Sequence, residues 1–218
     1  MSNKEYDYIL KYIMIGDAKV GKSSLSLNYA RHKFNPEYES TLGVEFLKKD
    51  VHIRNKTYHI QIWDKAGKKD FFTITKAYFK NTACALVVYD ITDRNSFDNV
   101  TFWVENFKNE TIEKVLIVLV GNKSDLNNKR QVSTEEGQDL ADKLGILFFE
   151  TSAKTGENVE NIFFKSIDEI AKRIDDNYYD LEYDICGIKK EKKLNNWVFL
   201  IIIGLWEVNN KIIKINLY

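Results

Sequence analysis

The stretch GDAKVGKS, residues 16–23, decides the fold of this 218-residue chain. It fits the pattern G-x4-G-K-[ST], directly after the strand-like run YILKYIMIG and directly before SSLSLNYARH, which has helical spacing. In that context the pattern predicts a phosphate-binding loop, because the glycines let the backbone wrap phosphates that face the helix N–H groups. The alternative is an ordinary glycine-rich turn, which the strand and the helix on either side disfavour.

Two side chains of this loop have predicted roles. Lys22 is placed to reach the β- and γ-phosphates of a nucleotide, and the Ser23 hydroxyl is placed to bind Mg²⁺. The other residues that we expect around the phosphates are Asp17, Ala18, Lys19, Val20, Gly21 and Ser24.

Apolar runs of strand length alternate with helix-patterned segments up to about Asp175. Strands are expected at residues 8–16, 44–55, 56–63, 83–91, 114–121 and 146–151, with Asn55 in the tight turn between the second and third. Helices are expected at residues 23–32, 71–81, 96–109, 133–145 and 157–174, with Ser96 as an N-cap and a capping box and Gly145 bounding the fourth. This alternation indicates an α/β fold whose mostly parallel sheet is covered on both faces, with the ligand at the carboxyl ends of the strands.

Two further loops follow strands at that same edge of the sheet: GNKSDL, residues 121–126, and ETSAK, residues 150–154. The Asp125 carboxylate can accept hydrogen bonds from guanine N1–H and the exocyclic amine, whereas adenine presents an acceptor there and is rejected. The backbone N–H of Ala153 is expected to donate to guanine O6. The residues expected to hold these loops or contact the base are Asn122, Lys123, Asp125, Ser152, Ala153 and Lys154. The alternative for Asp125, a helix cap or turn residue, is disfavoured by the phosphate loop upstream.

Composition limits the class of protein. Hydrophobic residues make up 44% and charged residues 29% of the chain, as in ordinary globular proteins, and the net charge of zero gives no sign of a nucleic-acid partner. Cys84 lies in the apolar run ACALVVY and is expected to pack rather than form a disulfide, which favours a cytoplasmic setting. The N-terminal segment lacks an apolar core of signal-peptide length.

The alternation stops near Asp175, so we expect one nucleotide-binding domain over residues 1–175 and an extension over residues 176–218. The extension passes from acidic and tyrosine-rich sequence through KKEKK to the apolar run WVFLIIIGLW, residues 197–206, which is too short to cross a bilayer. The run and its basic collar could form an interfacial membrane anchor. It shows no polar face, which favours the alternative that the last twenty or so residues are not a selected structure.

With these motifs in place, the chain resembles a small GTPase of the Ras superfamily, and most closely its Rab branch. The resemblance runs from about Tyr8 to Ile174 and includes LGVEF (42–46), IQIWDKAG (60–67), FFTITKAYFKN (71–81) and ALVVYDIT (85–92). It implies a P-loop NTPase G domain with a six-stranded sheet in the order 2-3-1-4-5-6, strand 2 being antiparallel. It also implies a GTP/GDP switch in vesicle traffic, in which two loops order around the γ-phosphate and Mg²⁺.

The resemblance assigns further roles by position. Thr41 would close onto Mg²⁺, Asp64 would hold a Mg²⁺ water, and the Gly67 N–H would sense the γ-phosphate. Phe34 would pack edge-on against guanine. The residues expected to serve hydrolysis are Lys22, Thr41, Gly67 and Lys68.

The resemblance also implies protein partners. They are an exchange factor, a GTPase-activating protein of the TBC kind, and effectors that contact the aromatic residues Phe46, Trp63 and Tyr78. Core packing is the alternative for these aromatic side chains. A peripheral location on endomembranes would follow, although Cys186 lies 32 residues from the last residue, too far for a C-terminal prenylation signal.

The segment DKAGKKD, residues 64–70, departs from the family, whose members usually read WDTAGQE there. Lys68 stands in place of the glutamine that orients the attacking water. Glutamine can accept a hydrogen from water while its amide donates, whereas lysine has three donors and no acceptor. A lysine would stabilise bound GTP as much as the transition state, and such uniform binding does not speed chemistry. We therefore expect slow intrinsic hydrolysis and a bias toward the GTP state.

Three further lysines lie near the expected phosphates: Lys19, Lys65 and Lys69. They either add phosphate affinity or are solvated surface charges, and for Lys69 we favour the second. The sequence thus leaves three functions open. The leading one is a Rab-like GTPase, followed by a GTP-locked pseudo-GTPase that binds effectors without cycling. The third is a P-loop ATPase or small-molecule kinase, against which NKSD and ETSAK argue.

Overall fold

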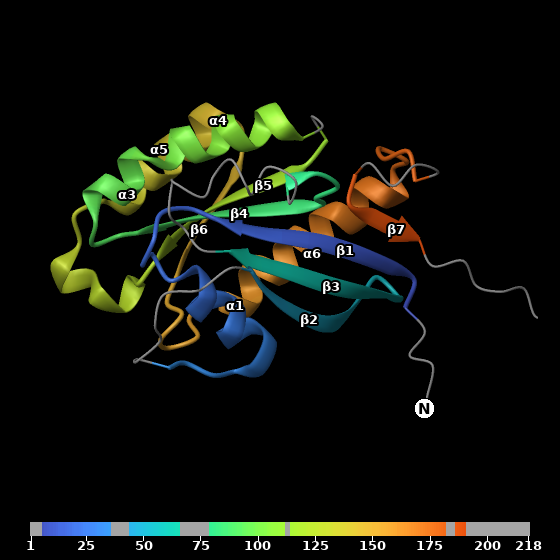
Figure 1. Cartoon of the computed structure of the whole chain (residues 1–218), viewed down its shortest axis with the longest axis horizontal. Helices are drawn as coiled ribbons and strands as arrows, with labels where there is room; N and C mark the ends of the chain where they lie inside the picture. The colour runs from blue at the N-terminus through green and yellow to red at the C-terminus, as the bar shows by residue number, and fades with distance from the viewer. Residues whose placement is uncertain (1–5, 36–43, 66–78, 112–113, 182–185, 191–218) are drawn as a thin grey trace, which may run out of the picture.

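A computed structural model describes residues 6–35, 44–65, 79–111, 114–181 and 186–190 of the chain (Figure 1). The elements in order are β1 (Tyr8–Ile15), α1 (Lys22–Arg31), β2 (Val44–Ile53), β3 (Lys56–Lys65), β4 (Cys84–Asp90), α3 (Arg94–Asp98), α4 (Val100–Glu110), β5 (Leu116–Asn122), the 3₁₀ helix η2 (Ser124–Lys129), α5 (Thr134–Leu144), β6 (Leu147–Thr151), α6 (Val159–Asp175) and β7 (Ile188–Lys190). The helix expected at residues 71–81 lies outside the described residues except for its end.

The predicted strand order is confirmed. The sheet runs β2-β3-β1-β4-β5-β6, and each neighbouring pair is parallel except β2 with β3. The β2–β3 hairpin turns at Arg54 and Asn55, whose φ angles of 51° and 60° match a two-residue turn in which both central residues are left-handed. All parallel strands therefore end at one edge, where the loops after β1, β5 and β6 emerge.

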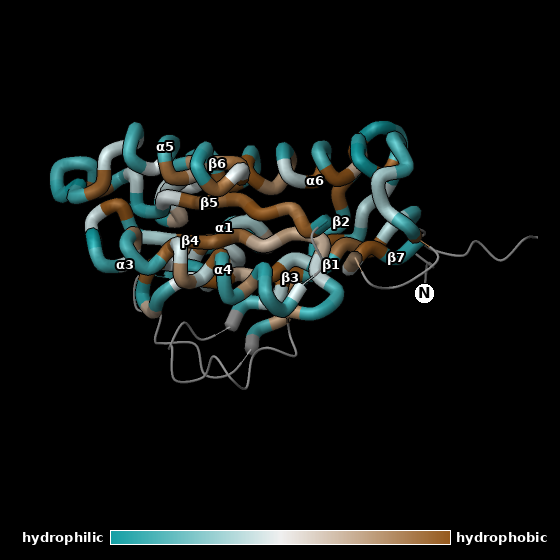
Figure 2. Tube along the Cα trace, turned by 90° about the horizontal axis from the view of Figure 1, so that it is seen from above, coloured by the Kyte–Doolittle hydropathy of each residue, from teal (hydrophilic) through white to brown (hydrophobic). Residues whose placement is uncertain are grey.

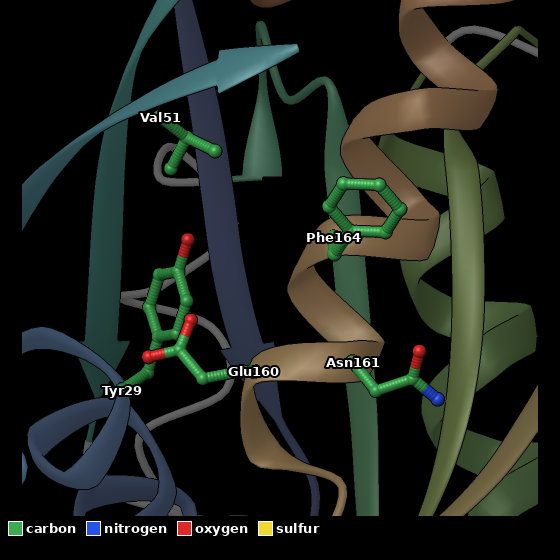
Figure 3. A pocket seen from close by; sticks show the side chains of 5 residues that line it. All are labelled: Tyr29, Val51, Glu160, Asn161 and Phe164. Atoms are coloured by element: carbon green, nitrogen blue, oxygen red, sulfur yellow. The ribbon is translucent and has the colours of Figure 1, made fainter.

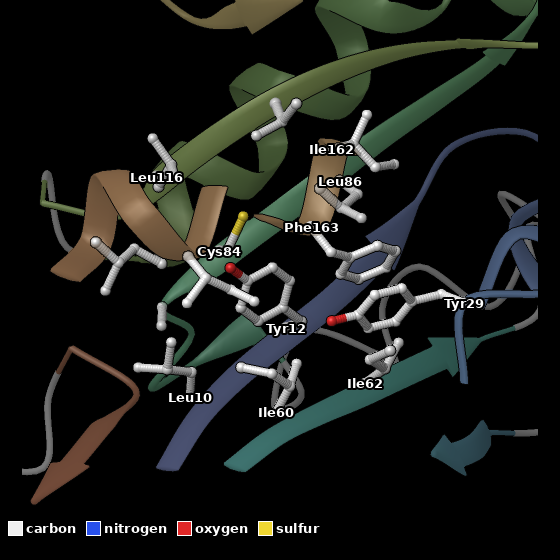
Figure 4. Packing of buried hydrophobic residues seen from close by; sticks show 14 of the residues in the cluster. Leu10, Tyr12, Tyr29, Ile60, Ile62, Cys84, Leu86, Leu116, Ile162 and Phe163 are labelled. Carbon is white, nitrogen blue, oxygen red and sulfur yellow. The ribbon is translucent and has the colours of Figure 1, made fainter. Parts of the chain in front are cut away.

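The two faces of the sheet follow from the alternation of side chains along each strand. On β1, Tyr12 and Met14 pack with α1 and α6, whereas Ile13 and Ile15 pack with α3, α4 and α5. Figure 2 shows the central strands as hydrophobic ribbons between helices whose outer sides are hydrophilic. In the first core the rings of Tyr29 and Phe163 stack at a centroid distance of 3.6 Å beside Tyr12 (Figure 4). Because both faces of the sheet are covered, β4 and β5 are buried at every position and apolar except at their ends.

A seventh strand was not predicted, so the expectation of a six-stranded sheet needs correction. β7 pairs antiparallel with Tyr8–Leu10 of β1. These residues precede the part of β1 that pairs with β4, which begins at Tyr12. Gly187, with φ of 67°, lies so close to residues 81–83 that a Cβ there would come within 2.4 Å of the Asn81 carbonyl oxygen. Cys186 is buried, and both cysteines are free, as expected for Cys84. Part of the predicted extension therefore packs on the domain, while the boundary near Asp175 stays a prediction.

Side-chain caps define the starts of α3 and α5. The capping box at Ser133 and Glu136 is present, and Gly145 closes α5 in the left-handed conformation with φ of 66°. The predicted helix over 96–109 is instead two helices, α3 and α4, and the N-cap is Asp93 rather than Ser96. Ser96 lies inside α3 because its hydroxyl accepts from the Asp90 N–H, which ties the helix to the end of β4. Within the described ranges, no helix has both the length and the apolarity needed to span a bilayer.

Candidate functional site

Asn122, the last residue of β5, joins the three loops at the carboxyl edge of the sheet. Its Nδ2 donates to the Val20 carbonyl of the phosphate loop at 2.9 Å. Its Oδ1 accepts from the Ala153 N–H at 3.1 Å and from the Thr151 hydroxyl at 3.3 Å, both at the end of β6. The side chain is only 1% exposed, so it acts as a fixed link between segments about 30 and 100 positions away.

The contact to Ala153 changes one expectation. The sequence assigned this backbone N–H to guanine O6, but in the structure it donates to Asn122. A bound guanine would have to share this donor or use another one. The Ala153 carbonyl, in turn, accepts from Asn28 Nδ2 of α1 at 3.1 Å, so this loop is fixed from two sides.

Asp125 lies at the start of η2 and is half-buried. Its Oδ1 accepts from the Ser152 hydroxyl at 2.6 Å, which brings the NKSD and ETSAK motifs together as predicted. Ser152 is fully buried and also accepts from the Thr155 N–H, so its own position is fixed. The carboxylate is thereby held in one orientation at the edge of the sheet. This is the geometry needed to read the hydrogen-bond donors of a planar base.

Lys123 spans the gap between the base loop and the phosphate loop. It has the left-handed φ of 71°, and its ammonium is 2.5 Å from Asp90 Oδ2 at the end of β4. It also donates to the Lys19 carbonyl at 3.0 Å. Lys19 has a φ of 67°, a conformation that favours glycine, while its side chain is exposed. Both alternatives for its side chain, phosphate affinity and a solvated charge, stay open.

The phosphate loop folds around the Lys22 ammonium. That group donates to the Asp17 carbonyl at 2.6 Å and to the Gly16 carbonyl at 3.1 Å. Burial lowers the pKa of Lys22 to about 8, although the nearby carboxylates of Asp64 and Asp17 act in the opposite direction. A buried cation compensated only in part is a natural binding partner for phosphate oxygens.

The Asp64 carboxylate lies opposite, near the end of β3. Burial raises its pKa to about 6, against the lowering effects of the Ser23 hydroxyl and the Lys22 ammonium. Within the described part of the chain, neither carboxylate oxygen has a hydrogen-bond partner of good geometry. Such a buried, unsatisfied group calls for an explanation, and a cation supplies one. Proteins usually hold Mg²⁺ through one or two oxygen ligands plus substrate phosphates, so Asp64 and Ser23 fit this ion.

Several predicted residues fall outside the described ranges: Thr41, Gly67, Lys68, Lys69 and Tyr78. Among those described, Phe34 follows α1 and is 38% exposed. Phe46 is 42% exposed, and its ring meets that of Trp63 edge to face at a centroid distance of 5.1 Å. Core packing, the alternative for this pair, is therefore wrong for Phe46.

Four side chains that support the site were not predicted: Asp90, Asn99, Trp103 and Thr151. Asp90 and Thr151 are polar residues at the ends of apolar strands, a signal that could have identified them. Asn99 and Trp103 lie on or beside helix α4, and no local pattern distinguishes them from an ordinary helix boundary and a core aromatic residue.

A separate hollow of about 320 Å³ lies between α1, β2 and α6. Figure 3 shows its lining, which is Tyr29, Val51, Glu160, Asn161 and Phe164. None of these residues belongs to the three loops, and the Glu160 carboxylate is already paired with Lys49 at 2.6 Å. The hollow is therefore not part of the nucleotide site.

Comparison with known proteins agrees with this geometry. The model of the Ras family matches residues 11–172. The chain is 45% identical over 172 residues to the Ras-related protein Rab-2B of Dictyostelium discoideum, covering 79% of this chain and 85% of that protein. The family match includes all three loops. The chain therefore belongs to the Ras family, as a small GTPase of the Rab type that binds GTP and GDP with Mg²⁺ and hydrolyses GTP.

Proposed function

We propose that this Rab-like switch of vesicle traffic holds guanine nucleotide through the three loops joined by Asn122, and that it hydrolyses GTP slowly by itself. The observation that carries the first part is the set of fixed contacts from Asn122 to Val20, Ala153 and Thr151, which brings phosphate and base loops to one place. Lys22 then faces the phosphates, and Asp125 reads the base. Mg²⁺, when bound, supplies charge neutralisation at the phosphate oxygens.

The residues of this chain provide binding and orientation. Asp64 and Ser23 lie where they would hold Mg²⁺, and the buried Lys22 ammonium would stabilise charge on the β- and γ-phosphates. Thr41 and Gly67 would complete the site around the γ-phosphate. Phe46 and Trp63, with Tyr78, are proposed as the surface that meets effectors, and the exposure of Phe46 supports this. The membrane contact is proposed to be peripheral, on endomembranes.

Slow hydrolysis follows from Lys68, which cannot accept a hydrogen from water. Single-turnover hydrolysis of bound GTP should therefore be at least about tenfold faster in Lys68→Gln than in the unchanged chain, since positioned acceptors contribute factors of this size or larger. The measurement is phosphate release from GTP-loaded, full-length protein. Lys129→Gln, an exposed lysine of η2, serves as the control because it removes the same charge away from the phosphates.

Equal and appreciable rates in the two proteins would contradict the role of Lys68, and another group would then orient the water. A TBC-type activating protein that supplies its own glutamine should narrow the difference between them. The matches to the Ras family and to Rab-2B do not favour the alternative, a GTP-locked binding module, over a GTPase that cycles.

The raised pKa of Asp64 predicts a pH dependence of Mg²⁺ binding. Metal ligands must be deprotonated, so the titration of Asp64 should leave Mg²⁺ affinity unchanged between pH 7 and 8 and by itself lower it about tenfold per pH unit below the pKa of about 6. Titration of Mg²⁺ into the GDP complex at pH 5 to 8 measures this. The terminal phosphate of GDP, like a phosphate monoester, has a pKa of about 6, which is close to that of Asp64.

Asp64→Asn separates the two titrations. At pH 7 the variant should bind Mg²⁺ at least about tenfold more weakly, as loss of a group that orients a metal ligand typically does. It should also show a shallower decline below pH 6, because only the phosphate titrates. An identical pH profile in both proteins would show that Asp64 does not take part.

A further inference from the structure

The Asp17 side chain is engaged by helix α4. Asp17 follows Gly16 in the phosphate loop, and its Oδ1 accepts from the Trp103 indole N–H at 2.7 Å. Its Oδ2 accepts from Asn99 Nδ2 at 2.6 Å. Both carboxylate oxygens are therefore committed to donors of α4 and its N-cap, and neither is directed at a phosphate. We call Asp17, Asn99 and Trp103 the Asp17 cluster.

The donors of the cluster are held rigidly. Trp103 is 1% exposed and belongs to the core formed by α3, α4 and α5. Asn99 ends α3 and caps α4, where its N–H donates to the Asn95 carbonyl and its carbonyl accepts from the Trp103 N–H. Asn99 and Trp103 are four positions apart, so one turn of helix brings both side chains to the same face. The break between α3 and α4 is what places this face over the phosphate loop.

Asp17, the acceptor of the cluster, also contacts Lys22, the cation expected to bind phosphate. The Asp17 carbonyl accepts from the Lys22 ammonium at 2.6 Å, the shorter of the two contacts of that group. Fixing the Asp17 side chain therefore fixes the carbonyl that orients Lys22. The loop around it also holds Lys19 at a φ of 67°, a left-handed conformation that is unfavourable for a residue other than glycine and persists only where the surroundings fix it.

We propose that Asn99 and Trp103 are positioning residues for nucleotide binding, which hold the phosphate loop in its binding conformation through Asp17 and so slow the release of GDP. The inference rests on the phosphate site proposed above. When the loop is already ordered in the free protein, nucleotide binding loses no free energy to ordering it, and the affinity is higher. The negative charge of Asp17 also supports the cationic form of Lys22, since it raises the pKa of that ammonium.

The test compares GDP release from full-length variants with their thermal stability. Trp103→Phe keeps an aromatic ring but removes the indole N–H and part of the buried ring volume, and Asn99→Ala removes the second donor without changing the core. Loss of a hydrogen bond to a charged group should accelerate GDP release about tenfold in Trp103→Phe. Phe107→Leu is the matched control, because Phe107 is a fully buried ring of the same helix whose aromatic contact is with Phe79. It should lower Tm while leaving GDP release nearly unchanged.

Two further readouts separate positioning from simple stabilisation. Asp17→Ala removes the acceptor of both contacts, so Asp17→Ala combined with Trp103→Phe should release GDP little faster than Asp17→Ala alone. The Trp103 indole N–H resonance, assigned by its loss in Trp103→Phe, should shift in Asp17→Ala and stay in place in Phe107→Leu. Release rates that track Tm across all variants, or additive effects in the double variant, would overturn the proposal. Failure of the unchanged chain to bind GDP would instead contradict the phosphate site itself.

Discussion

Asp125→Asn should lower the affinity of the protein for GDP about a thousandfold, because two hydrogen bonds from guanine to a carboxylate are each worth about 1.5–3 kcal/mol. The amide can accept from N1–H but presents a donor to the exocyclic amine, which is itself a donor. The same amide matches xanthine, which has a carbonyl at that position. Affinity for xanthosine diphosphate should therefore rise while affinity for GDP falls.

Competition of both nucleotides against a fluorescent GDP analogue measures the two affinities. Asp142→Asn is the control, since it removes one carboxylate from the exposed side of α5, where Asp142 accepts only from Gln138 among side chains. The fold should survive in Asp125→Asn, because the new side chain can still accept from the Ser152 hydroxyl. A variant that lost GDP and gained no xanthosine diphosphate would place the base elsewhere.

Asn122→Ala should reduce the free energy of unfolding by about 3 kcal/mol, because it leaves the Val20 carbonyl, the Ala153 N–H and the Thr151 hydroxyl without their partner. All three contacts are buried, so water cannot fully replace the lost partner. GDP release should accelerate at least about a hundredfold, in proportion to the stability that the three loops lose together.

Urea denaturation and GDP release measure these two effects. Asn127→Ala in η2 is the matched control, because the exposed Asn127 side chain accepts only from Arg130 and its loss should change stability by less than about 0.5 kcal/mol. If Asn122→Ala were no more destabilising than Asn127→Ala, the three loops would be held together by other contacts. Hydrogen exchange at the Ala153 amide would then show whether those other contacts protect this loop.

Much of the fold could be read from the sequence because its signals are local. Strand-length apolar runs, the turn at Asn55 and the capping box at Ser133 each act over a few residues, and the structure contains all of them. The N-cap of α3 was misplaced because Asp93 and Ser96 are both good caps, and the choice depends on the Ser96 contact to Asp90. β7 was missed because a three-residue strand has no periodicity of its own.

The candidate site divides in the same way. The phosphate loop, NKSD and ETSAK were identified by spacing, because each motif must present fixed atom types to a phosphate or a base. What their side chains bond to could not be read. The donor that the Ala153 N–H was expected to offer to guanine is used by Asn122, and the Asp17 side chain faces α4 rather than the phosphates.

The class of fold, the strand order implied by the resemblance to Rab proteins, and the loops expected to bind a guanine nucleotide could all be predicted from local pattern and order along the chain. How the side chains of those loops are held depends on tertiary contacts. Trp103 lies 86 positions from Asp17, and Asn122 lies 102 from Val20. Contacts over such separations arise from the packing of α4 and β5 against the phosphate loop, and no short-range pattern encodes them.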